Sequence, residues 1–152
     1  MKAVSTFLFG LWLAAGAAYA AAPAAAPKPF QFVLQNGLQV VVVPDTRAPV
    51  VSQMLWYKTG AADDPPGLSG MAHFFEHMMF RGTRAFPGDG FSRAVTRSGG
   101  EDNAFTTPDA TVFFERVGRD KLRFAMHLEA DRMRNLNLSD DAVATERSVV
   151  LA

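Results

Sequence analysis

LSGMAHFFEHMMF, residues Leu68–Phe80, is a nearly all-apolar stretch that three ionisable side chains interrupt: His73, Glu76 and His77. Ser69 can cap a helix that carries this stretch. At about 100° per residue, the two histidines lie about 40° apart and the glutamate lies about 60° to their other side, so all three share one arc. The opposite side of the helix is filled by Met71, Phe74, Phe75 and Met78. We therefore expect a buried helix with one polar arc.

The spacing of these three residues suits zinc chemistry. Histidines at positions i and i+4 can present their imidazole nitrogens to one tetrahedral Zn²⁺, and Glu76 would then activate the metal-bound water for attack on a peptide carbonyl. His73-x-x-Glu76-His77 reverses the commoner His-Glu-x-x-His order and has the inverzincin pattern, HxxEH. The alternative is a core helix in which both histidines bond to neighbours and Glu76 lies at the surface.

The segments before this helix predict strands. Phe30–Leu34 and Leu38–Val43 form a hairpin, and Asn36-Gly37 predicts a type I′ turn with positive φ at both central residues. Val50–Lys58 is a third β-rich segment. The Pro-rich segment Asp63–Gly67 must be a loop.

The segments after it alternate in type. Gly90–Arg97 predicts a short helix, and Asp102–Thr107 and Ala110–Val117 predict two strands. A helical period then runs to Asn135, and Ser139 caps a last helix that continues to the end of the sequence. One face of the first of these two helices contains Leu122, Ala125, Met126, Glu129 and Met133. The order β-β-β-α-α-β-β-α-α predicts an α+β fold, with helices on one face of a mainly antiparallel sheet.

The two ends of the sequence indicate export and truncation. Residues 1–20 combine Lys2, an apolar run and Ala18-Tyr19-Ala20, which predicts a signal peptide cleaved after Ala20 and a secreted or periplasmic protein. Residues 21–29 predict an Ala/Pro-rich tether, so the folded domain would be 30–152. The last helix shows no stop signal at residue 152, which predicts a C-terminally truncated domain or a fragment.

Composition narrows the possible partners. Fifteen basic and fifteen acidic residues give a net charge of zero, so we expect neither nucleic acid nor, for the mature protein, a membrane as partner. The sequence has no cysteine, so the exported protein must be held together by its core or by a metal.

Four blocks of the sequence resemble the zinc metallopeptidase family M16, the group of pitrilysin, insulysin and mitochondrial processing peptidase. They lie in the order and spacing of the N-terminal domain of that family. The blocks are His73–Thr83, Gly99–Thr107, Glu129–Met133 and Glu146–Leu151. The resemblance implies a fold like half of a LuxS or processing-peptidase metallohydrolase, and a zinc endopeptidase that cleaves extended peptides.

The resemblance also implies roles for single residues. His73 and His77 would bind zinc, Glu76 would be the catalytic base, and Glu146 would orient an imidazole. The third ligand is expected seven residues after Glu146, at position 153, one past the end of this sequence. Candidates within the sequence remain open, namely Glu146 itself, Glu129 and His127.

Asn103, Ala104 and Phe105 match the edge strand on which the family receives its substrate. An extended peptide would pair with the backbone of this strand. The alternative is a plain sheet strand with Phe105 in the core. The resemblance further implies a second M16-type domain or subunit. Two other functions remain open, a non-catalytic partner subunit and an inert truncated polypeptide.

Overall fold

The computed structural model describes residues 28–151, and these fall into two compact units that divide between Asp45 and Thr46. The predicted signal peptide and most of the predicted tether lie outside the described residues. The first unit is an antiparallel hairpin of β1 (Phe30–Val33) and β2 (Gln39–Val42), with Phe30 opposite Val42 and Val33 opposite Gln39.

The hairpin was predicted correctly, but its turn was not. Among the described residues, only glycines have positive φ, so Asn36 does not adopt the type I′ conformation. The Gly37 amide donates to the Leu34 carbonyl at 2.9 Å, and Gly37 has φ of 86°. The Leu34 amide donates to the Leu38 carbonyl at 2.9 Å. This is a three-residue loop, in which one left-handed glycine closes the turn.

The second unit contains a three-stranded antiparallel sheet in the order β3-β5-β4. The strands are β3 (Val50–Tyr57), β4 (Glu101–Thr106) and β5 (Thr111–Gly118). The central strand β5 places Thr111 opposite both Tyr57 of β3 and Thr106 of β4. Within this sheet β4 is an edge strand, because it pairs with β5 alone.

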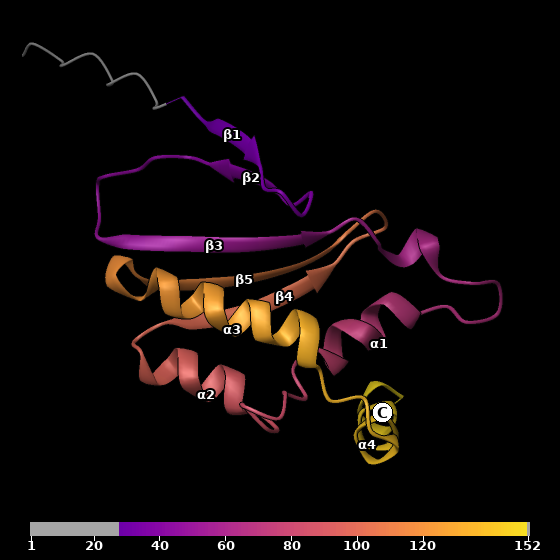
Figure 1. The fold of residues 1–152 in the computed structure, drawn as a ribbon. Coiled ribbons are helices and arrows are strands. Elements are labelled where there is room, and N and C mark those ends of the chain that lie inside the picture. The colour runs from indigo at the N-terminus through magenta and orange to yellow at the C-terminus, as the bar shows by residue number, and fades with distance from the viewer. Residues whose placement is uncertain (1–27, 152) are drawn as a thin grey trace, which may run out of the picture. The chain divides into compact units, whose positions relative to one another are not determined.

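Three helices, α1 (Met71–Met78), α2 (Gly90–Arg97) and α3 (Leu122–Asn135), contact the sheet and lie on one side of it (Figure 1). The fourth, α4 (Asp140–Val150), packs against α1, and the Ser139 hydroxyl caps it by accepting from the Ala142 amide, as predicted. Two short 3₁₀ turns, Ala61–Asp63 and Arg119–Lys121, complete the unit. The α+β prediction with helices on one face is confirmed. No helix in residues 28–151 is long and apolar enough to cross a membrane.

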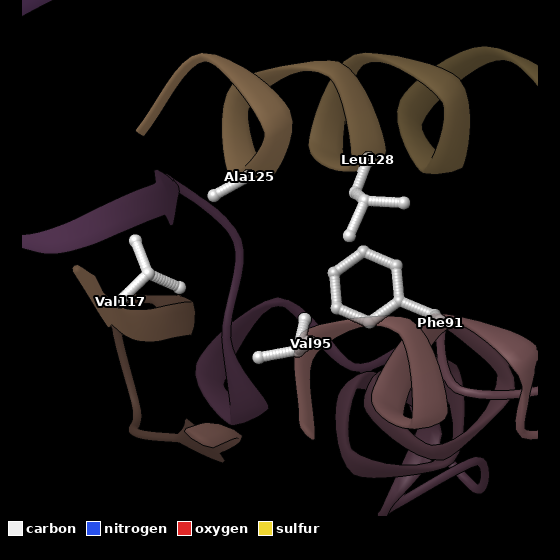
Figure 2. Close-up of a cluster of buried hydrophobic side chains, with 5 residues drawn as sticks. All are labelled: Phe91, Val95, Val117, Ala125 and Leu128. Carbon is white, nitrogen blue, oxygen red and sulfur yellow. The ribbon is translucent and has the colours of Figure 1, made fainter. Parts of the chain in front are cut away.

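The core lies between α2, α3 and the sheet. Figure 2 shows its five buried side chains pointing toward one another from these three elements. They are Phe91 and Val95 of α2, Val117 of β5, and Ala125 and Leu128 of α3. This packing fixes the sheet against the helices, and thereby the strand β4 against which α1 also packs.

The face of α3 that the helical period indicates is buried only in part. Ala125 and Glu129 are buried, whereas Met126 and Met133 are 57% and 50% exposed. The buried stripe instead continues through Leu128 and Arg132. Charge is costly to bury, but Arg132 has partners that offset this cost.

Candidate metal centre

The helix α1 begins with help from a residue outside it. Gly70 precedes the helix with φ of 92°, and no side chain in the adjacent sequence caps it. The carboxylate of Asp64 accepts from the amides of Gly70 at 2.7 Å and Ala72 at 2.8 Å. The predicted cap by Ser69 is therefore wrong. The 63–67 loop instead places the Asp64 carboxylate at the amides that begin the helix.

The imidazoles of His73 and His77 converge on one turn of α1. Their Nε2 atoms are 3.2 Å apart, and their rings meet edge to face with centroids 4.7 Å apart. Two nitrogens at about 2.05 Å from a tetrahedral Zn²⁺ would be about 3.3 Å apart, so the observed spacing fits one ion shared by both rings.

Glu146 of α4 fixes the orientation of His77. Its Oε1 lies 2.7 Å from Nδ1 of His77, so the proton of the ring resides on Nδ1 and the Nε2 lone pair faces His73. The other carboxylate oxygen forms an ion pair with Arg81. Glu146 is 3% exposed, so this buried carboxylate is compensated on both sides.

Glu76 lies beside the histidines, on the wall of a pocket of about 410 Å³. Thr106, the last residue of β4, donates its hydroxyl to Oε2 of Glu76. His77, Phe80, Arg81, Asp89, Asn103 and Glu146 also line the pocket. The pocket therefore joins the polar arc of α1 to the edge strand β4 and to α4.

The predicted substrate strand does form the edge of the sheet. Asn103 lines the pocket, and its Oδ1 accepts from the Ala104 amide at 2.8 Å. Phe105 is 39% exposed and packs against Trp56 and Phe114 on the face away from the helices. The alternative that placed Phe105 in the core is therefore wrong, since strand alternation turns Ala104 and Thr106 toward the helices instead.

Other candidate ligands within the sequence do not join the two histidines. No group of three His, Cys, Asp or Glu side chains in residues 28–151 is arranged to hold a metal ion. Glu146 is bonded to His77 and Arg81, and Glu129 is buried against Arg132. His127 lies exposed on α3.

A buried arginine, Arg132, packs behind one of the side chains that line this pocket. Arg132 is 1% exposed, and its guanidinium carbon lies 4.1 Å, 4.4 Å and 5.3 Å from the ring centroids of Phe91, Phe113 and Phe80. Its Nε donates to Glu129 at 3.1 Å, and its Nη2 pairs with the other oxygen of that carboxylate. Phe80 lines the pocket, so Arg132 holds one wall of it from behind.

A second carboxyl group shares this cation. Glu115 of β5 is 1% exposed, with Oε1 3.5 Å from Nη2 of Arg132 and Oε2 accepting from Gln53 at 3.2 Å. Burial raises the pKa of Glu115 to about 9; Glu129 acts in the same direction and the Arg132 guanidinium opposes both. Burial therefore favours the protonated form of Glu115, and the Arg132 guanidinium pairs with Glu129.

The sequence did not predict two contacts at this centre, the ion pair of Arg81 with Glu146 and the hydrogen bond of Thr106 to Glu76. Arg81 lies four residues after His77, and its position alone does not indicate a partner on α4. Thr106 was assigned to a strand without a role, although strand alternation from Ala104 would have turned it toward the helices. Both contacts depend on packing between elements that are distant in the sequence.

The centre thus places two convergent histidines of α1 beside the edge strand β4 of an α+β fold. The sequence pattern of the family described as Insulinase (Peptidase family M16) matches residues 39–152. The chain belongs to this family.

Similar proteins agree with this assignment. The chain is 38% identical over 125 residues to the zinc protease PqqE of Helicobacter pylori, covering 82% of this chain and 28% of that protein. A crystal structure of a protease from Helicobacter pylori superposes with a TM-score of 0.78 at 38% identity, over 82% of this chain and 30% of that one. The crystal structure of the first half of the periplasmic protease PqqL from Escherichia coli superposes with a TM-score of 0.75 at 27% identity. The match covers 82% of this chain and 28% of that one. The chain thus spans less than a third of the length of each of these proteins.

Proposed function

We propose that this chain supplies the metal-binding domain of a zinc-dependent endopeptidase that hydrolyses extended peptides. The observation that carries the proposal is the 3.2 Å spacing of the two Nε2 atoms, with the tautomer of His77 set by Glu146. His73 and His77 would hold Zn²⁺, and the third ligand is expected at position 153, past the last residue of this sequence. The similarity to proteins named zinc proteases supports the choice of metal.

Zn²⁺ bound there would supply a Lewis acid that polarises the peptide carbonyl and acidifies water beside Glu76. Glu76 would accept a proton from that water and return it to the leaving amine. Its place on the wall of the pocket, one residue before His77, supports this role. Glu146 and Arg81 would keep His77 in its metal-binding orientation.

The edge strand β4 would bind the substrate through its backbone, with Asn103, Ala104 and Phe105 as the contact segment. Backbone pairing places few demands on the peptide sequence, so the substrates are extended chains of varied sequence. A second M16-type domain or subunit would complete the enzyme, which the match to the first half of PqqL supports. The periplasmic location of PqqL supports export of this protein to the periplasm or the medium.

The test is Glu76→Gln in the complete protein that the gene encodes. We expect peptide cleavage to be lost while zinc content, measured by atomic absorption, is retained. Asp120→Asn, which removes a charge from a side chain that is 76% exposed, is the control and should cleave as wild type. If Glu76→Gln still cleaves peptides, Glu76 is not the base.

A further inference from the structure

Thr106 makes a hydrogen bond that the family resemblance does not assign. Its hydroxyl donates to Oε2 of Glu76 and joins the end of β4 to the middle of α1. Both side chains are partly buried, so water competes weakly with this bond. A hydrogen bond to an ionised carboxylate is also about twice as strong as a neutral one.

The backbone around Thr106 is fixed from the side of β5. Thr106 lies opposite Thr111, and the turn that follows is closed by the Thr107 amide donating to the Ala110 carbonyl at 2.8 Å. The Thr107 hydroxyl donates to the same carbonyl at 2.9 Å and accepts from the Ala110 amide at 3.0 Å. Thr106 therefore ends strand β4 directly before a turn that three hydrogen bonds close.

The same turn is joined to the loop that starts α1. The amides of Ala61 and Ala62 donate to the carbonyls of Thr107 at 3.0 Å and Pro108 at 2.9 Å. A Cβ on Gly60 would lie 2.3 Å from the Thr107 carbonyl oxygen, so only glycine permits this approach. Three residues after Ala61, Asp64 caps α1. The strand that carries Thr106 and the helix that carries Glu76 are thus held by one connected set of contacts.

We propose that Thr106 is a positioning residue for Glu76, which rests on the proposed function of Glu76 as the base. The hydroxyl holds Oε2, and Glu76 lines the pocket, so the bond restricts the orientation of the carboxylate that would accept a proton there. A threonine hydroxyl both donates and accepts, so it can bond to Glu76 in its ionised and its protonated form. The contacts above then join β4, the proposed substrate strand, to the helix that carries the base, which helps to fix the base relative to a bound peptide.

The test compares Thr106→Val, which keeps the shape and removes the hydroxyl, with Thr106→Ser, which keeps the hydroxyl. Both are made in the complete protein and assayed on one internally quenched peptide that the wild type cleaves. Loss of an orienting partner typically costs 10- to 100-fold, so we expect Thr106→Val to lower kcat by about that factor, with KM within about twofold. Thr106→Ser should keep kcat within about threefold of wild type. Zinc content should be unchanged in both variants.

Thr111→Val is the matched control. It removes a buried hydroxyl from the residue opposite Thr106, where the donor serves the Thr59 carbonyl at 2.9 Å instead of Glu76. We expect this variant to lose stability but to retain kcat. If Thr106→Val keeps the wild-type kcat, or if Thr106→Ser is as impaired as Thr106→Val, the inference is wrong. If Glu76→Gln abolishes cleavage in the same assay, the proposed function stands in either case; if Glu76→Gln cleaves, the function and the inference fall together.

Discussion

Glu115→Gln tests whether a buried carboxyl keeps its proton in the folded chain. In the fold the pKa of Glu115 is raised by burial from 4.5 to about 9. Between these values the folded state holds a proton that the unfolded state has released. The free energy of unfolding therefore falls as the pH rises through this window, and the contribution of Glu115 is complete only below about pH 4.5.

The size of this effect follows from the linkage of one proton. One proton gives a slope of about 1.4 kcal/mol per pH unit, so between about pH 6 and about pH 8 Glu115 lowers stability by up to about 2.7 kcal/mol. Glutamine does not titrate, and its amide has nearly the size of the carboxyl group and can both donate and accept hydrogen bonds. The variant should therefore gain stability relative to the wild type as the pH rises, and between about pH 6 and about pH 8 this difference should grow by roughly the amount just given.

The measurement is urea unfolding, followed by far-UV circular dichroism across this pH range. Glu101→Gln is the control, because that side chain is 62% exposed and pairs with Arg116 at the surface. It should leave the pH dependence unchanged. If Glu115→Gln retains the slope of the wild type, Glu115 is ionised in the fold and the assignment of its proton is wrong.

Two further outcomes are expected. Glu146→Gln weakens the partner of His77 and should lower the zinc affinity of the complete protein by about 10- to 100-fold in a chelator competition, whereas unchanged affinity would remove Glu146 from the centre. Gly82→Ala should destabilise the chain by about 1–3 kcal/mol or more in urea unfolding, because Gly82 has φ of 81° and a Cβ would lie 2.2 Å from the Phe86 carbonyl oxygen. Gly67 has a similar φ of 84°, but an added Cβ would have no neighbour within 4 Å, so Gly67→Ala should lower the free energy of unfolding less. Equal losses of stability in the two variants would show that the contact with Phe86 is unimportant.

Local periodicity predicted most of the elements. The helix Gly90–Arg97 has the predicted bounds, and the strand predicted at Val50–Lys58 ends one residue earlier, at Tyr57. The polar arc of His73, Glu76 and His77 also followed from spacing alone, and the ring nitrogens of its histidines converge as expected. These features depend on residues close in sequence, so a single segment contains the information.

Features that depend on distant partners were not predicted. Arg132 is buried because Glu129 pairs with it and three aromatic rings from separate segments surround it, and hydropathy along α3 cannot show those rings. Asp64, which replaces Ser69 as the cap, reaches the helix only because the 63–67 loop folds back. The bond from Thr106 to Glu76 likewise requires α1 to pack on β4.

The cap supplied by Asp64 has a consequence for transplanting this centre. The helix α1 has eight residues, which is too short to be stable as an isolated peptide in water. A synthetic peptide of residues 68–80 would lack both its cap and the packing of α4, so its histidines would not be held 3.2 Å apart. A graft of this centre onto another scaffold must therefore include the loop from Asp64 and an acidic helix that faces His77.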